Sequence, residues 1–268
     1  MTNFTKLNFG NLNQLYIFSF VLLLAFLGSV FVATPVSAAV APARWIVPKN
    51  PKAVVIVIHG GSWVGEKEWF LDDMNPYAQK LSNLSGSATM NIDYRTGSSS
   101  LNDVVASYDI ARKKFPNLPI CAAGNSAGGN LALLLANKRP LNCVISEVGP
   151  TNLYTGSEYI KNIAAYHFNK ENFRAWSPIY TTKKLRSPTM LVSATNDPIV
   201  PHSQALEFKN KFPKAILVTL RPGDKLGTYH VHEPVDSAQL EIARKREANF
   251  IKQVAKQYQK TKRTSAVR

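Results

Sequence analysis

Cysteine is nearly absent from this 268-residue chain, which has only Cys121 and Cys143. Two cysteines cannot build the multiple-disulfide framework that stabilises many small secreted domains. Neither has a CxxC partner or a histidine at ligand spacing, so we expect no metal site. Both lie in apolar runs that are typical of strands. One bridge between them is the alternative, but we expect buried free thiols in neighbouring strands.

Acidic residues are also scarce, with 17 Asp and Glu against 32 Lys and Arg, giving a net charge of +15. Residues 244–268 contain nine Lys or Arg and one Glu, a run that could meet anionic lipid, a wall polymer or nucleic acid. Apolar residues within it fall mostly at helical spacing, so we expect a solvated terminal helix followed by a basic flexible tail at 259–268. The sequence has no basic patch interleaved with aromatic residues of the kind that favours nucleic acid, so nucleic acid is not an expected partner.

Charge is almost missing from the first 43 residues, where Lys6 is the only charged side chain. The apolar stretch Leu15–Ala33 precedes Val36-Ser37-Ala38, a small-residue pattern typical of signal-peptide cleavage. We therefore predict a signal peptide at 1–38 and a secreted or cell-envelope protein. The stretch is also long enough to cross a bilayer, so a retained anchor is the alternative. Membrane association through either end of the chain is compatible with these features.

The rest of the chain shows no composition shift that would divide it, so we expect one domain over 39–258. Short Val-, Ile- and Leu-rich runs alternate with longer helix-compatible stretches. Runs without polar alternation suit strands covered on both faces, and the strand-helix alternation predicts an α/β fold with a mainly parallel sheet and helices on both faces. The expected strands are 53–58, 88–92, 119–123, 142–146, 189–193 and 215–220, and the expected helices are 72–84, 102–115, 129–137, 202–211 and the terminal helix.

One segment, 151–180, is longer than an ordinary strand-to-strand crossover and is rich in Tyr, Phe and Trp. It could be a small cap that supplies an apolar wall to a substrate site. It could equally be a surface excursion that buries its aromatic residues against the core. The sequence does not favour either interpretation.

A Gly-x-Ser-x-Gly pattern surrounds Ser126, between a predicted strand and a predicted helix. A serine in such a tight turn needs glycine two positions before and after it, here Gly124 and Gly128, because the backbone leaves no space for Cβ atoms. The turn presents the hydroxyl beside the first amides of the following helix, which favour developing negative charge. We therefore predict Ser126 as a nucleophile.

A serine nucleophile needs a histidine to accept its proton and a carboxylate to orient that histidine. Asp197 follows a predicted strand, and His230 and His232 follow the next one, which gives the chain order Ser, Asp, His. We prefer His230 slightly as the base, because His232 lies nearer the terminal helix. Asp224 is a competing acid that precedes the histidines in their own loop, and we prefer Asp197.

The remaining requirement is a set of amide donors for the oxyanion. Gly60, Gly61 and Ser62 follow the first predicted buried strand, and their amides are candidates together with that of Ala127. His59 precedes the glycines and could be mistaken for the base. We expect it to hold the glycine loop by a hydrogen bond. This chemistry requires no metal and no organic cofactor.

Several of these segments together resemble the α/β-hydrolase superfamily, in the carboxylesterase-like branch that includes hormone-sensitive-lipase-type esterases and kynurenine formamidases. The matching segments are His59–Trp63, Asp93–Arg95, Gly124–Gly129, Ser177-Pro178 and Asp197–Pro201, followed by a later histidine. The resemblance implies Ser126 as nucleophile, Asp197 as acid and a histidine base. It also implies oxyanion donors at Gly60, Gly61 and Ala127.

The chain departs from the branch at a few positions. Asn125 stands where an acidic residue or Gln is common, Ser62 replaces a third glycine, and 96–98 differs from the frequent Leu-Ala-Pro-like sequence. These departures bear on which branch of the superfamily the chain resembles, and not on the expected hydrolytic chemistry. The expected activity is hydrolysis of carboxylic esters of short acyl groups, with a small-molecule ester as partner. The alternatives are a formamidase or small peptidase using the same residues, and a hydrolase-fold binding protein without activity.

Overall fold

The computed structural model describes residues 42–225 and 235–266. The chain divides into Met1–Ser37 and Ala38–Arg268, and every described residue belongs to the second unit. The predicted signal peptide lies outside the described residues. Within the described ranges, no helix is long and apolar enough to cross a membrane.

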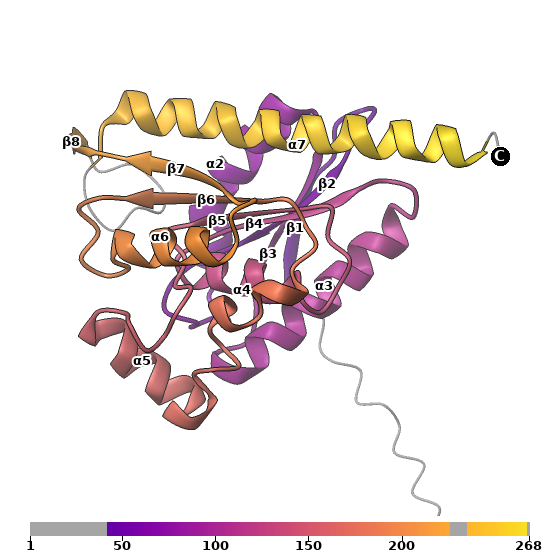
Figure 1. Cartoon of the computed structure of the whole chain (residues 1–268). Helices are drawn as coiled ribbons and strands as arrows, with labels where there is room; N and C mark the ends of the chain where they lie inside the picture. Colours follow the sequence, from indigo (N-terminus) through magenta and orange to yellow (C-terminus); the bar gives the residue numbers. More distant parts are fainter. Residues whose placement is uncertain (1–41, 226–234, 267–268) are drawn as a thin grey trace, which may run out of the picture. The chain divides into compact units, whose positions relative to one another are not determined.

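The centre of the described domain is a seven-stranded sheet in the order β1-β3-β2-β4-β5-β6-β7 (Figure 1). β1 is antiparallel to β3 and the other neighbouring pairs are parallel, so β2 to β7 all end at the same edge. The strands are β1 (Ala43–Ile46), β2 (Val54–Ile58), β3 (Ala88–Ile92), β4 (Ile120–Asn125), β5 (Cys143–Glu147), β6 (Thr189–Ala194) and β7 (Ile216–Leu220), and a short β8 (Pro222–Lys225) follows.

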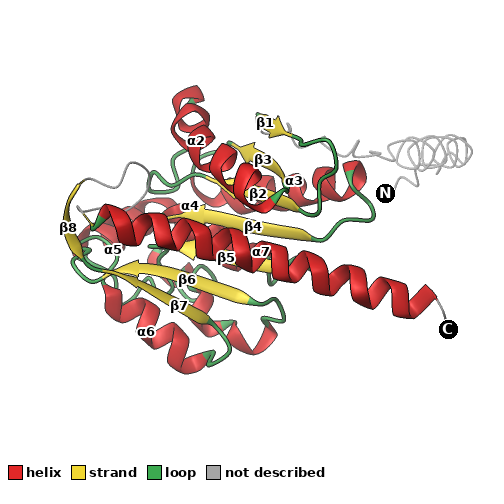
Figure 2. Cartoon of the chain, turned by 90° about the horizontal axis from the view of Figure 1, so that it is seen from above, coloured by secondary structure: helices red, strands yellow, loops and turns green. Residues whose placement is uncertain are grey.

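Helices cover both faces of the sheet, and each face has its own apolar core. The helices are α2 (Glu68–Ser85), α3 (Ser100–Lys114), α4 (Ala127–Leu135), α5 (Glu158–Phe168), α6 (His202–Lys211) and α7 (Ser237–Ala266). Along β2, Val55 and Val57 pack with residues of α2 and α7, whereas Ile56 and Ile58 pack with residues of α3 and α4. Figure 2 shows α7 crossing the strands on the α2 side. This alternation explains why the strands are apolar without interruption.

The predicted α/β class and mainly parallel sheet are confirmed. β1 was not expected, because its four residues follow directly on the N-terminal segment and their side chains are only half-buried. The insertion 151–180 contains an unexpected helix, α5. The expectation of a flexible tail at 259–268 needs correction, because α7 continues to Ala266. Its apolar spacing ends earlier than the helix does, and exposed Lys and Gln, good helix formers, extend it.

The expectation of two free thiols is wrong, because Cys121 and Cys143 form a disulfide. They lie directly opposite each other on the parallel neighbours β4 and β5, with Cα atoms 4.5 Å apart. That separation is within the range a disulfide spans. The sequence indicated neighbouring strands but not their register, and register decides whether the two side chains meet.

Candidate active site

The predicted site residues gather at the edge where the parallel strands end. Gly60 comes two residues after β2, Ser126 directly follows β4, and Asp197 comes three residues after β6. β2, β4, β5 and β6 are neighbours in that order. In open parallel sheets, loops at this edge form the binding sites.

Ser126 has a strained backbone, with φ 48° and ψ −123°, between the end of β4 and the start of α4. A Cβ atom on Gly124 would lie 2.4 Å from the carbonyl oxygen of Gly128, and one on Gly128 would lie 2.2 Å from that of Ile58. Both glycines are therefore required by close backbone packing. Strained backbone of this kind persists where its surroundings enforce it, often at active sites.

The Ser126 turn is held from both sides. Its amide donates to the carbonyl of Glu147 at the end of β5, at 2.8 Å, and its own carbonyl accepts from Asn130 at 3.1 Å. That second bond begins the hydrogen-bond ladder of α4, so the amide of Ala127 precedes the ladder. The Ser126 side chain is buried, with 8% of the residue exposed.

Asp197 lies in the loop after β6 and is 6% exposed. Its Oδ1 accepts the amides of Ile199 and Val200, each at 2.8 Å, which fixes the carboxylate against its own loop. Only β5 separates the strands that carry Ser126 and Asp197. Two strand spacings correspond to about 10 Å, which leaves room for an imidazole ring between the side chains.

The histidine candidates His230 and His232 lie outside the described residues. The described chain on either side of them is nevertheless fixed. Pro222 forms a β-bridge with Val235, and the amide of Asp236 donates to the carbonyl of Arg221 at 3.1 Å. The described residues that flank the segment 226–234 therefore lie side by side beyond the end of β7. The competing acid Asp224 belongs to β8, and its side chain is outside the description.

The glycine loop after β2 has an unusual backbone. Gly61, Ser62 and Trp63 all have positive φ, at 90°, 56° and 57°. A Cβ atom on Gly60 would lie 3.1 Å from Cβ of Ser126, so the loop runs directly beside the serine. The hydroxyl of Ser62 forms a hydrogen bond with Tyr159 Oη of α5, at 2.7 Å, and so links the glycine loop to the insertion.

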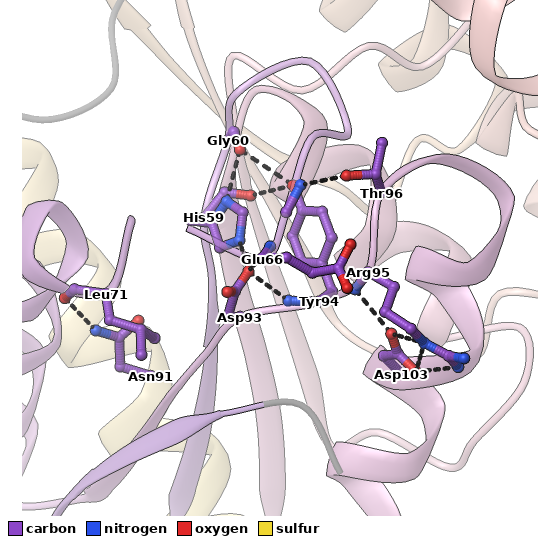
Figure 3. A network of polar contacts seen from close by, with 11 residues as sticks. His59, Gly60, Glu66, Leu71, Asn91, Asp93, Tyr94, Arg95, Thr96 and Asp103 are labelled. Atoms are coloured by element: carbon purple, nitrogen blue, oxygen red, sulfur yellow. Dashed lines mark hydrogen bonds and ion pairs between the residues drawn. The ribbon is translucent and has the colours of Figure 1, made fainter. Parts of the chain in front are cut away.

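His59 is 1% exposed and holds this loop (Figure 3). Its Nδ1 contacts the carbonyl oxygen of Gly60 at 2.7 Å, and its Nε2 contacts Oδ1 of Asp93 at 2.9 Å. The imidazole is stacked between Phe70 and Tyr94, with ring centroids 4.1 and 4.0 Å away. A histidine with both nitrogens engaged and both faces covered serves the loop rather than a reacting substrate.

Asp93 is the anchor of this network. Burial opposes its ionisation, but hydrogen bonds from His59 and from the amides of Tyr94 and Glu66 outweigh burial, so the pKa of Asp93 lies below its usual value. A carboxylate that accepts several hydrogen bonds is stabilised in its charged form. The charge on Asp93 thus fastens the loop on both sides of the glycines.

The next two residues extend the same support. The hydroxyl of Tyr94 donates to the carbonyls of His59 and Gly60, at 3.0 Å each, and Arg95 forms a bidentate pair with Asp103 on α3. In the sequence, Asp93–Arg95 stands out only as part of the resemblance, and no role is predicted for these three residues. Its position immediately after a buried strand, next to the glycine-loop strand, was the available signal.

The insertion 151–180 buries some of its aromatic residues and also contacts the candidate site. Trp63 Nε1 donates to Asn130 Oδ1 at 3.2 Å, and its ring packs edge-on against Phe168 of α5, at 5.1 Å. Asn130 in turn donates to the carbonyl of Trp176 at 2.9 Å. The insertion is therefore attached to α4 and to the glycine loop, which is expected of a cap. It also buries Phe168, which is expected of a surface excursion.

A buried ionic network joins α7, which follows the histidine segment, to the strand beside Ser126. Arg244 pairs with Glu147 at the end of β5 and, at 3.0 Å, with Glu247 on its own helix. Tyr77 of α2 donates to Glu247 at 3.2 Å. Burial raises the pKa of Glu247 against the opposing effect of Arg244, and raises that of Tyr77 well above its usual value.

No group of three or more His, Cys, Asp or Glu side chains within 42–225 and 235–266 is arranged to hold a metal ion. The described side chains around Ser126 belong instead to loops that present amides and hydroxyls. This arrangement suits the capture of a carbonyl oxygen that gains negative charge.

We predict that Asp93→Asn removes an acid-sensitive part of the stability. Because folding depresses the pKa of Asp93, its contribution is present above the unfolded-state pKa and is lost as pH falls through the folded-state value. At neutral pH we expect the variant to be about 1–3 kcal/mol less stable, and the deficit to shrink at acid pH. Urea unfolding from pH 7 to pH 3 measures this, and a pH-independent deficit would contradict it.

We predict that Arg244→Leu destabilises the fold by about 3–5 kcal/mol, because Glu147 and Glu247 would stay buried without their cation. Arg246→Leu is the matched control, since Arg246 is exposed on the same helix and should cost less than about 0.5 kcal/mol. Urea unfolding at neutral pH compares the two variants. Equal stability of both would show that the buried network contributes nothing.

Solved structures similar to this chain include esterases. An esterase/lipase from an uncultured bacterium has TM-score 0.66 and 16% identity, with 81% of this chain and 82% of that chain covered. The hyperthermophilic esterase from the archaeon Pyrobaculum calidifontis has TM-score 0.65 and 20% identity, with 80% and 81% covered. A truncated carbohydrate esterase from gut microbiota has TM-score 0.64 and 16% identity, with 80% and 90% covered.

At these identities the solved structures establish the fold. No curated protein matches the chain. The BD-FAE family model matches residues 46–212, a range that includes the glycine loop, Ser126 and Asp197. The chain therefore belongs to the BD-FAE family, and it has the α/β fold of these esterases.

Proposed function

We propose that the protein is a serine hydrolase of carboxylic esters, with Ser126 as nucleophile, Asp197 as acid and a histidine of the segment 226–234 as base. The observation that carries the proposal is the strained Ser126 turn, with its φ of 48°, directly beside Gly60. A turn that only connects β4 to α4 would not need two glycines packed against the backbone of β2. The named esterases of similar fold support the ester class.

The reaction would proceed through an acyl-enzyme. Ser126 Oγ attacks the acyl carbonyl carbon while its proton passes to the histidine. The carbonyl oxygen becomes an oxyanion, stabilised by amides among Gly60, Gly61, Ser62 and Ala127. The ester bond breaks, and the histidine returns its proton to the leaving alcohol. Water then attacks the acyl group with the same assistance, releasing the acid and regenerating Ser126.

Short acyl groups are the proposed substrates. The insertion contributes one α-helix of 11 residues, and its Tyr159 is tied to Ser62 of the glycine loop. A helix fixed so close to the oxyanion donors restricts the length of the acyl group that can lie beside Ser126. The same residues could hydrolyse an N-formyl amide, so a substrate panel should contain both classes.

Export from the cytoplasm is part of the proposal. The disulfide between Cys121 and Cys143 supports it, because disulfides persist in oxidising compartments and are rare in the cytosol. The apolar stretch Leu15–Ala33 also supports export, because such a stretch is typical of a signal peptide.

We predict that Ser126→Ala lowers kcat on short-chain p-nitrophenyl esters by a factor on the order of 10⁴ or more, because the nucleophile is lost. Ser107→Ala is the control, since this buried serine bonds only within α3, to the carbonyl of Asp103. It should retain activity. A wild-type protein active on N-formyl compounds but not on esters would favour the formamidase alternative. Activity that survives Ser126→Ala would overturn the mechanism.

We predict that His230→Ala abolishes turnover and that His232→Ala retains most of it, because we place the base in the strand-end loop rather than near α7. Separate kcat measurements on one acetyl ester decide between them. Loss only in the His232 variant would move the base to that residue. Full activity in both would exclude the segment as the source of the base.

A further inference from the structure

The basic residues of this protein are concentrated in the connections that lead into the strands. Five connections lead into β2, β4, β5, β6 and β7, and we take two of them together with the last residues of α3 and α6. The resulting segments are 47–53, 112–119, 136–142, 181–188 and 209–215. Together these segments contain thirteen Lys or Arg and no Asp or Glu. A chain with 32 basic and 17 acidic residues would be expected to have several acids among them.

These five connections lie at one edge of the molecule. The strands they enter are parallel, so their beginnings share an edge, and that edge is opposite the one where Ser126 lies. Figure 2 shows the arrowheads of β4 and β6 pointing away from it, and the C-terminal part of α7 extending toward it. We call this set of connections, with residues 252–263 of α7, the basic edge.

Contacts tie α7 to the connections. Lys262 donates to Asn117 in the connection before β4, at 2.8 Å. A groove of about 350 Å³ is lined by Asn142, Arg186 and Tyr258, among others, and so joins two connections to the helix. A second groove of about 330 Å³ also includes Arg186, beside Lys183, Lys211 and Lys214. Four of the five connections and α7 are therefore joined into one surface.

Local structure explains only some of these charges. Arg112 and Lys209 donate to backbone carbonyls of their own connections, as cations near helix C-termini do. Lys49 and Lys52, however, lie between two strands and follow no helix. Lys183, Arg186 and Lys214 are exposed and form no ion pair with the described residues.

The acids lie elsewhere. Asp93, Glu147 and Asp197 belong to strand ends or to connections that leave the strands, and others, such as Asp72 and Asp103, lie on helices. Near the basic edge, Asp109 is neutralised by Arg139 at 2.7 Å, and Glu207 faces Lys211 at 3.8 Å. The molecule thus has a strongly positive edge, whereas the opposite edge carries Asp93, Glu147 and Asp197.

We propose that the basic edge is a docking surface for an anionic lipid bilayer, on which the protein sits with its active-site edge facing away. The charge complementarity is direct, because phosphate head groups attract clustered Lys and Arg. The spread of the charge over five connections and a helical segment about 18 Å long suits a flat partner rather than a single bound ion. Phe115, Phe212 and Tyr258 are half-buried, so bases of a nucleic acid would find no exposed ring to stack on.

Vesicle binding by the full-length protein tests the proposal. The variant Lys183→Glu/Arg186→Glu/Lys214→Glu reverses three charges of the basic edge, and Lys67→Glu/Lys170→Glu/Lys245→Glu reverses three exposed charges elsewhere. The two variants have the same net charge and the same N-terminus, so neither feature can cause a difference between them in vesicle binding. Partitioning is measured on phosphatidylglycerol-containing vesicles and on phosphatidylcholine vesicles.

We expect the basic-edge variant to partition onto anionic vesicles on the order of 100-fold less than the wild type, with the control variant close to the wild type. Salt of about 0.5 M should remove the wild-type preference for anionic lipid. Equal losses in both variants, no preference for anionic vesicles, or binding to soluble polyphosphate without binding to vesicles would each overturn the proposal. Ester hydrolysis should be unchanged in both variants, so failure of docking is separate from failure of the catalytic proposal.

Discussion

The close packing of the Ser126 turn against β2 is the constraint on which the rest of the site depends. Gly124 and Gly128 bring backbone against backbone at distances that no Cβ could tolerate. This contact sets the start of α4, and hence the Ala127 amide, beside the serine. It also brings Gly60 to the serine from the neighbouring strand. A single steric condition therefore brings together the proposed nucleophile and its proposed amide donors.

Two buried charges maintain the surroundings of that contact. Asp93 secures the glycine loop through His59 and nearby amides, on one side of Ser126. Arg244 secures α7 against Glu147, whose carbonyl holds the Ser126 amide. The first network links the glycine loop to the end of β3, and the second links α7 to the end of β5. Charged groups buried at such positions are costly unless paired, so the pairing specifies one arrangement of the elements.

Most of the fold could be predicted from apolar runs, because strands covered on both faces have no polar alternation to obscure them. α6 was predicted at its observed bounds and β3 likewise. β1 and α5 were missed because β1 is short and α5 lies in an aromatic-rich insertion. Strand register is a tertiary property, so the disulfide was missed as well. In the site, glycine spacing indicated Ser126, whereas the role of Asp93 depends on contacts with His59 and the loop amides that form only in the folded chain.

The most direct test of the account is identification of the residue modified by a fluorophosphonate on the full-length protein. After brief labelling at neutral pH, digestion and mass spectrometry locate the adduct. We predict one adduct, on the peptide that contains Ser126, and none after acid unfolding. An unlabelled Ser126, or an adduct on another serine, would contradict the claim that the strained turn carries the nucleophile.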